Sequence, residues 1–428
     1  MPSGLDLSRS RPHPIPLHVA EIARRVEHLR GLRFKRLPRV RVVPASQLGP
    51  IGHRLRAQAA HRLTIHPSLA RRERRLARAQ LGLQRLAGLF PLPAATEASG
   101  GRASAEQIGG AYDYSRHAIL LVNGAMATRR QLHVVLAHEL VHALEDQHFD
   151  LRLTTVRGPS ESQQARRALI EGTATFVAAR YDHRYQGNTE PVRLAISSQQ
   201  SVFTAGGETP YAVKASTIFD YVSGPLFAAD LYRRAHGSWR LVDRALRDPP
   251  ELSHEILEPA SWPGRRQPPT IHLFGARPAG RRWHLVGGGM AGQEMLLSLL
   301  GAGAPTRYAE QAAAGWEGGR FAVWRRPADG CAIGCQTDTS GVIAVRLRDH
   351  AAVARVARAY FAYALLGLVG ERIGERTWRI GDGYVALGTS QRSAAIAFTP
   401  SKRRARLLAL TAALDAGPLA RRKAPSVH

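Results

Sequence analysis

A run of three ionisable residues lies inside a long apolar stretch, and no other feature constrains the fold of this chain so strongly. His138, Glu139 and His142 form the pattern His-Glu-x-x-His. On an α-helix, residues four apart lie one above the other on the same face. The two imidazoles can therefore present nitrogen atoms to one metal ion, with Glu139 beside them. The pattern predicts a metal-binding helix.

The residues around this pattern predict that the helix is buried. Thr128 followed three residues later by Gln131 is a capping box, and neither Pro nor Gly interrupts residues 125–150. Apolar residues recur along the stretch at helical spacing: Leu132, Val135, Leu136, Leu140, Val141 and Leu144. Burying two imidazoles and a carboxylate is costly unless something satisfies them, and a divalent cation does so. The alternative is a core helix whose histidines hydrogen-bond to backbone carbonyl groups.

A second helix is expected to supply a third ligand. Catalytic zinc sites usually have three protein ligands and one open position, and the pattern itself is that of the zinc-binding helix of metallopeptidases. Ser160-Glu161-Ser162-Gln163 is another capping box, which predicts a helix through Arg180. Glu171 is an isolated acid on it, among apolar and small residues that would let two helices approach closely. We expect Glu171 to be the third ligand; the alternative is a half-exposed Glu on an amphipathic helix.

These segments resemble a known family. The residues that carry the resemblance are His138-Glu139-Leu140-Val141-His142-Ala143-Leu144, Asp146-Gln147 and Ala168-Leu169-Ile170-Glu171-Gly172. They are similar to the gluzincin branch of the zincin metallopeptidases, and more narrowly to bacterial and archaeal neutral zinc metallopeptidases. The resemblance covers about residues 110–180 and, more loosely, 215–262, where Tyr221, Gly224 and the Asp248-Pro249-Pro250 turn match. It implies that His138, His142 and Glu171 hold Zn²⁺.

The expected reaction is hydrolysis of peptide bonds. Bound zinc would lower the pKa of its water to about 7 and polarise the scissile carbonyl. Glu139 would take the proton of that water and deliver it to the leaving amine. Tyr221 is a candidate donor to the oxyanion, and an ordinary packed tyrosine is the alternative.

One departure from the family concerns the support of the metal ligands. Relatives often carry an acid shortly after the third ligand, whereas Thr173 and Thr175 stand there in this chain. Residues that hold ligands in place tune metal affinity and activity. We expect Asp146 or Asp150 to provide that support instead.

A short apolar run precedes the metal helix. Residues 118–122 are bounded by turn residues and predict a strand. In zincins the equivalent strand borders the cleft, and an extended peptide pairs with its open edge. A central core strand is the alternative.

The chain is strongly basic. It holds 60 Lys and Arg against 33 Asp and Glu, for a net charge of +27, and residues 1–100 alone hold 19 basic and 5 acidic residues. Basic runs lie at 71–75, 402–406 and 421–423. Such patches can bind nucleic acid or anionic lipid. Only four of the basic residues are Lys, however, so compositional drift in a GC-rich genome is the alternative.

The expected fold class is α+β. We expect a disordered N-terminus at 1–16, a basic helix-rich region at 17–105 and a mainly helical zincin-like domain with a short edge sheet at 106–262. A linker at 263–283, an α+β accessory domain at 284–415 and a basic tail at 416–428 would follow.

Several alternatives remain open at the level of the whole chain. No secretory signal is visible and no apolar stretch is long enough to span a bilayer, so a cytoplasmic protein is the default expectation, with export not excluded. Cys331 and Cys335 could form a local bridge or a free pair. The rivals to a zinc peptidase that acts on peptides or proteins are a zinc-binding interaction module with little turnover and a nucleic-acid- or envelope-associated protein with a structural metal.

Overall fold

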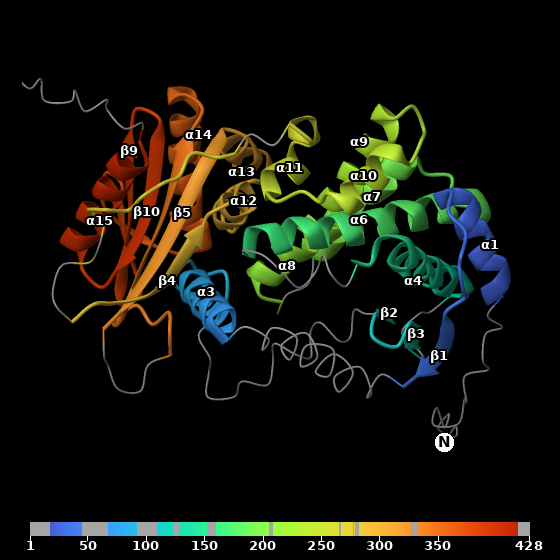
Figure 1. The fold of residues 1–428 in the computed structure, drawn as a ribbon. Coiled ribbons are helices and arrows are strands. Elements are labelled where there is room, and N and C mark those ends of the chain that lie inside the picture. Colours follow the sequence, from blue (N-terminus) through green and yellow to red (C-terminus); the bar gives the residue numbers. More distant parts are fainter. Residues whose placement is uncertain are drawn as a thin grey trace, which may run out of the picture.

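The computed structural model describes residues 18–44, 67–91, 109–122, 128–151, 160–204, 209–264, 267–276, 278, 282–326 and 332–417. Within these ranges a helical half and a half built on a large antiparallel sheet lie side by side (Figure 1). The predicted α+β class is therefore confirmed. The expectations for residues 1–16, for Cys331 and for the basic run 421–423 lie outside the described residues.

Helix α6 (Ser160–Tyr185) is the centre of the helical half. Helix α4 (Arg129–Phe149) packs against it, as does α9 (Gly224–Arg234). The other helices of this half are α1 (Val19–Arg30), α7 (Val192–Thr204), α8 (Tyr211–Ile218), the π-helix η2 (Phe219–Ser223), α10 (Arg240–Arg247), α11 (Ser253–Leu257) and the 3₁₀-helix η3 (Pro259–Ser261). The two helices predicted to carry the metal ligands thus lie next to each other.

A three-stranded sheet lies beside α4. Strand β3 (Ala118–Val122) pairs in parallel with β1 (Arg39–Val43) and antiparallel with β2 (Gly110–Asp113), so the order is β1-β3-β2. All five residues of β3 are buried. The expectation that residues 118–122 offer an open edge to a substrate is wrong, because both edges of β3 are already paired. The edge strands of this sheet, among the described residues, are β1 and β2.

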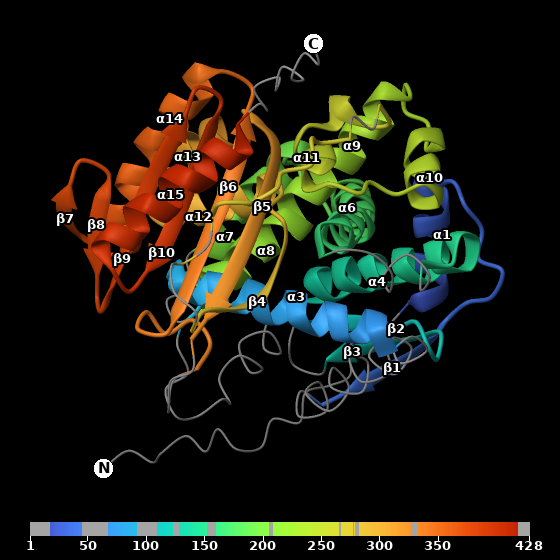
Figure 2. The ribbon, with the colours of Figure 1, turned by 60° about the vertical axis from the view of Figure 1, so that its left-hand side comes forward.

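A seven-stranded antiparallel sheet organises the other half. Its strands are β4 (His284–Met290), β5 (Trp316–Arg325), β6 (Thr339–Leu347), β7 (Glu371–Gly374), β8 (Thr377–Ile380), β9 (Gly383–Ser390) and β10 (Ser393–Thr399), in the order β4-β5-β6-β10-β9-β8-β7. One face carries α12 (Gln293–Gly301), α13 (Thr306–Ala313), α14 (His350–Ala362) and the π-helix η4 (Tyr363–Gly367), and the other face carries α15 (Lys402–Ala416) (Figures 1 and 2).

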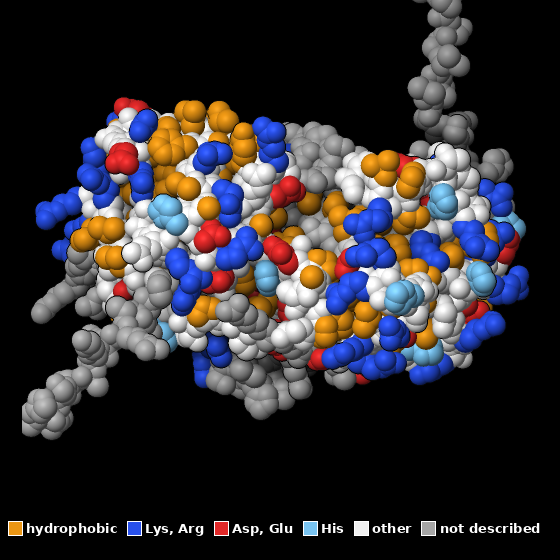
Figure 3. Space-filling model, turned by 90° about the horizontal axis from the view of Figure 1, so that it is seen from above, with side chains coloured by type: hydrophobic (Ala, Val, Ile, Leu, Met, Phe, Trp, Pro, Cys, Tyr) orange, Lys and Arg blue, Asp and Glu red, His pale blue; other side chains and the backbone are white. Residues whose placement is uncertain are grey.

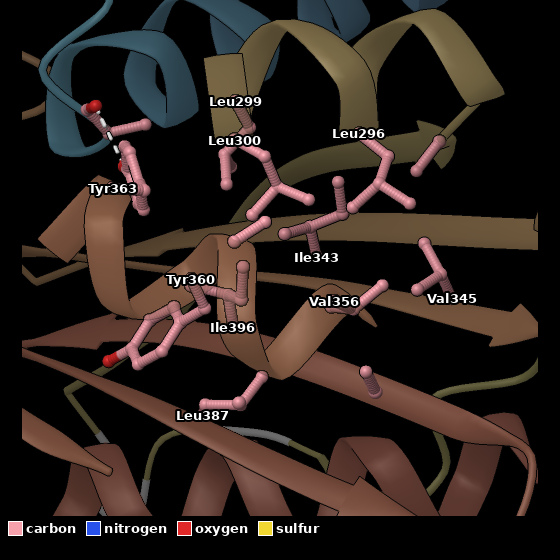
Figure 4. Close-up of a cluster of buried hydrophobic side chains, with 14 of the residues drawn as sticks. Leu296, Leu299, Leu300, Ile343, Val345, Val356, Tyr360, Tyr363, Leu387 and Ile396 are labelled. Carbon is pink, nitrogen blue, oxygen red and sulfur yellow. Dashed lines mark hydrogen bonds between the residues drawn. The ribbon is translucent and has the colours of Figure 1, made fainter. Parts of the chain in front are cut away.

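Alternation along the strands separates the two faces of this sheet. Large side chains such as Ile343 and Ile396 point towards α12 and α14, where they meet Leu296 and Val356 (Figure 4). On the face beneath α15 the strands present mostly alanine: Ala322, Ala344, Ala386, Ala395 and Ala397. Small residues there let α15 lie close to the sheet.

Helix α3 (Pro67–Leu86) belongs to the core of the sheet half although it precedes the helical half in sequence. It lies along β4 (Figure 2), where a Cβ added at Gly287 would come within 2.9 Å of the carbonyl oxygen of Arg75. The Tyr363 hydroxyl donates to the carbonyl of Ala87 just beyond α3, at 2.8 Å (Figure 4). The region expected at 17–105 is thus divided between two cores, since α1 and β1 pack in the helical half.

A buried ion-pair network holds α1 against the metal helix. Arg30 is fully buried and donates to Glu145 of α4 and to Asp243 of α10, each at 2.6 Å. Its guanidinium also lies 4.5 Å from the ring centroid of Trp239.

Across the part of the chain that is described, no helix combines the length and apolar character needed to cross a bilayer.

Candidate metal centre

Local sequence fixes the start and the direction of α4. The Thr128 hydroxyl accepts the backbone N–H of Gln131 at 3.2 Å, and the Gln131 side chain accepts that of Thr128 at 3.2 Å. Leu136, Leu140 and Leu144 are fully buried on this helix. The capping box and the apolar stripe therefore place the same residues on the buried face as the sequence predicts.

The side chains of His138, His142 and Glu171 converge on one point between α4 and α6. The two Nε2 atoms lie 3.0 Å apart. One Glu171 oxygen lies 3.3 Å from Nε2 of His138 and 3.4 Å from Nε2 of His142. The three residues each offer one ligand atom, and these atoms all lie within 4.8 Å of one another, so the group could hold a metal ion.

The charges of this cluster are strongly coupled. Burial opposes protonation of His142, but the neighbouring Glu171, with smaller contributions from Glu139 and Glu145, raises the pKa of His142 to about 9. Burial also opposes ionisation of Glu171, yet His142 and His138 hold its pKa well below the usual range. Oε2 of Glu171, the oxygen that faces both histidines, is buried and has no hydrogen-bond partner among the described residues. A cation at the convergence point would satisfy it.

Glu139 lies beside the cluster and next to β2, one of the two edge strands of the small sheet. Its side chain is only 6% exposed. Val122 donates to the carbonyl of Gly109 on the paired side of β2, so the alternating pattern turns the backbone of Tyr112 away from β3. The N–H of Tyr112 donates to the Glu139 carboxylate. Burial raises the pKa of Glu139, and the two histidines oppose that rise.

Tyr221 lies at the same cluster, on the π-helix η2. It hydrogen-bonds to Glu171, and the negative charge of Glu171 together with burial raises the pKa of Tyr221 well above its usual range. Its ring centroid is 6.2 Å from that of His138. Backbone contact between helices explains this placement, because a Cβ added at Gly172 would meet the carbonyl carbon of Gly224 at 2.2 Å.

The described hydrogen bonds of Asp146 do not reach His142. Asp146 accepts from the Tyr112 hydroxyl and from the N–H of Leu151, both at 3.1 Å. Nδ1 of His142 is buried and has no hydrogen-bond partner among the described residues, so neither Asp146 nor Asp150 holds that imidazole. Thr173 donates to a carbonyl of its own helix, at 2.9 Å.

Three residues near the cluster were not anticipated from the sequence. The ring of Tyr114 lies 6.4 Å from that of His142, and Glu171 and Glu139 help to raise the pKa of Tyr114 after burial itself. Arg167 of α6 forms an ion pair with Asp220 at 2.8 Å, directly before Tyr221 in the chain. Of these three, only Arg167 has a signal in the sequence: it precedes Glu171 by one helical turn, so the two lie on the same face of α6.

Basic side chains form no single patch on the face that Figure 3 shows, among the described residues. On the face in Figure 3, Lys and Arg are spread widely, with acidic and apolar side chains between them. The arginines of the run 71–75 are exposed on α3, as are the basic residues of 402–406 on α15. A polyanion partner stays a prediction.

Compared with protein-family models, curated proteins and solved structures, the chain matches none. What the site does must therefore be argued from its own geometry and chemistry.

Proposed function

We propose that this protein is a zinc-dependent peptidase that hydrolyses peptide bonds. The observation that carries the proposal is the convergence of two imidazole nitrogens and one carboxylate oxygen within 4.8 Å of one another. Two His and one Glu are a donor set of catalytic zinc sites, where the ligand atoms of a tetrahedral ion, at about 2.0–2.1 Å, lie roughly 3.3–3.4 Å apart. The separations of 3.0, 3.3 and 3.4 Å in this chain fit that arrangement.

The residues around the ligands have roles that suit this reaction. When bound, zinc supplies Lewis acidity, which polarises a carbonyl and lowers the pKa of water. Glu139, buried beside the two histidines, would accept a proton from the attacking water and return it to the leaving amine. Tyr221, which contacts Glu171, would donate to the oxyanion. Strand β2, an edge strand of the small sheet, lies beside Glu139.

Two variants test the proposal. We expect wild type to retain zinc after dialysis and to cleave an unstructured protein substrate. Glu139→Gln should keep the zinc and lose about 10²–10⁴-fold in rate, since it removes the general base. Glu171→Ala should lose most of the zinc. Glu375→Gln, a change of an exposed acid in the other half, should leave both unchanged.

Two results contradict the proposal. If wild type holds no zinc after loading and dialysis, the proposed zinc site is refuted. If Glu139→Gln cleaves as fast as wild type, the proposed role of Glu139 as general base is refuted.

One observation favours a second candidate function, a zinc-binding module with little turnover. Among the described residues, Nδ1 of His142 has no hydrogen-bond acceptor of the kind that usually orients a ligating imidazole. Loss of such a partner typically lowers metal affinity or activity about 10–100-fold. Wild type that holds zinc and cleaves no peptide would support this candidate over the first.

A further inference from the structure

We infer that a cavity between α3, α6, α8 and α12 receives an apolar side chain of the peptide substrate, two or three residues from the bond that is cut. The inference rests on the proposed function and adds a substrate preference to it. The cavity has a volume of about 460 Å³, within the range of roughly 300–1,000 Å³ typical of ligand sites.

The lining of the cavity suits one apolar group flanked by peptide backbone. The walls that are most buried are apolar: Leu83, Ala87, Leu89 and Leu299. The half-buried lining residues are mostly amides and hydroxyls, among them Gln80, Gln84, Gln163, Ser216 and Ser298. Amide and hydroxyl groups can make further hydrogen bonds to a peptide backbone beside those they already make within the protein, and the apolar walls exclude water from the side chain.

The charged groups of the lining already have protein partners. Glu294 accepts from Gln164 at 2.8 Å and from the Ser298 hydroxyl. Arg167 donates to Ser216 at 2.6 Å and pairs with Asp220. An ionic substrate group would have to displace these contacts, so the lining favours an uncharged occupant.

Helix α6 connects the cavity to the metal centre. Arg167 lines the cavity and precedes Glu171 by four residues, so both lie on one face of the helix. Gln163 precedes Glu171 by eight residues. At about 1.5 Å per residue, these positions lie roughly 6–12 Å from Glu171 along the helix axis. An extended peptide advances about 3.3–3.6 Å per residue, so two or three residues span the gap.

Three separate parts of the chain hold the cavity in shape. The N–H of Ala212 on α8 donates to the carbonyl of Leu89 beyond α3, at 2.9 Å. The hydroxyl of Tyr363, which belongs to the sheet half, donates to the carbonyl of Ala87 in the cavity wall. The bond from Gln164 to Glu294 joins α6 to α12. The N-terminal helix α3 and the sheet half thereby acquire a role in substrate selection.

Narrowing the cavity tests the inference. Ala212 lines it with a half-buried methyl group, so Ala212→Leu and Ala212→Phe should reduce its volume in steps. Wild type assayed with a randomised peptide library should prefer large apolar residues at one position, two or three residues from the cut. For such peptides Ala212→Phe should lower kcat/KM tenfold or more, and Ala212→Leu less. Peptides with Gly there should change less than twofold.

Controls separate this inference from the proposed function. Ala351→Phe, on the exposed face of α14, should leave the preference unchanged. Zinc content and melting temperature of the Ala212 variants should match wild type. In zinc-loaded Glu139→Gln, fluorescence anisotropy should show that the apolar peptide binds tenfold more weakly after Ala212→Phe.

The outcomes that overturn the inference are distinct. A library profile without preference at that distance, or an equal change for apolar and Gly peptides, refutes the pocket and leaves the peptidase standing. If zinc-loaded wild type cleaves no library peptide, the proposed function fails and the pocket assignment fails with it.

Discussion

The phenol of Tyr221 touches Glu171 in the structure, and this contact determines what its removal should do. A donor that meets the oxyanion only in the transition state contributes to kcat, typically about 10²–10³-fold. We expect Tyr221→Phe to lower kcat by that amount and to change zinc affinity less than tenfold. Zinc titration by competition with a chelator, together with steady-state kinetics, checks both. A loss of zinc affinity with full kcat at saturating zinc would instead make Tyr221 a positioning residue for Glu171.

Residues of the site differ in how far the sequence could predict them. His138, Glu139 and His142 follow from local spacing, because one helix fixes their relation. The ion pair of Arg30 and Glu145 could not be found this way, since the two are 115 positions apart and Arg30 is one of many arginines. Tyr114 was likewise missed, as nothing in its neighbourhood indicates that β2 brings it to the metal cluster.

At the scale of elements, the contact between α6 and the segment η2–α9 sets the distance from Tyr221 to Glu171. A Cβ added at Gly224 would lie 2.1 Å from the carbonyl oxygen of Ala168, so the helices must separate to admit it. We expect Gly224→Ala to reduce the free energy of unfolding by about 1–3 kcal/mol, as overpacking usually does. It should also weaken zinc binding, since Tyr221 would move from Glu171.

Denaturant unfolding of the zinc-free and zinc-loaded variant measures both effects. Gly374→Ala is the control, because its added Cβ would have no neighbour nearer than 3.6 Å. If Gly224→Ala is as stable as the control and binds zinc like wild type, close packing of these helices does not position the site.

Elements with a clear apolar pattern could be predicted from the sequence. Elements that depend on close approach between distant backbone segments could not. Residues 118–122 lie in a strand as predicted. Strand β4 was missed because it contains Gly287-Gly288-Gly289, and glycine is depleted in strands. The role of these glycines becomes visible only when α3 lies against them. That β3 is the central strand of the small sheet also depends on β1, which is distant in sequence.

At the scale of the whole molecule, Glu161 joins the two halves. Its buried carboxylate accepts the N–H of Ser253 on α11 at 2.7 Å, and the Ser253 hydroxyl donates to it as well. Glu294 of α12 donates its backbone N–H to the same hydroxyl oxygen at 3.1 Å. A Cβ added at Gly292 would overlap the Glu161 carboxylate, which shows how closely the sheet half approaches. Glu161 therefore lies where the halves meet, together with Glu294, whose pKa burial also raises.

The charge of Glu161 should make the joined molecule less stable at higher pH. Burial raises the pKa of Glu161 from 4.5 to about 7, despite the hydrogen bonds from Ser253 that lower it. Between these values the folded chain binds the proton more strongly than the unfolded chain, so stability falls as pH rises and the full cost is present above about pH 7. Glu161→Gln keeps an acceptor for Ser253 and cannot ionise. At saturating zinc, the melting temperature of wild type should therefore fall more between pH 5 and pH 8 than that of Glu161→Gln. Asp220, whose pKa burial also raises to about 7, should leave the variant some dependence in the same direction. The exposed Glu375→Gln variant should follow wild type, and parallel curves for wild type and Glu161→Gln would show that this carboxylate does not couple the junction to pH.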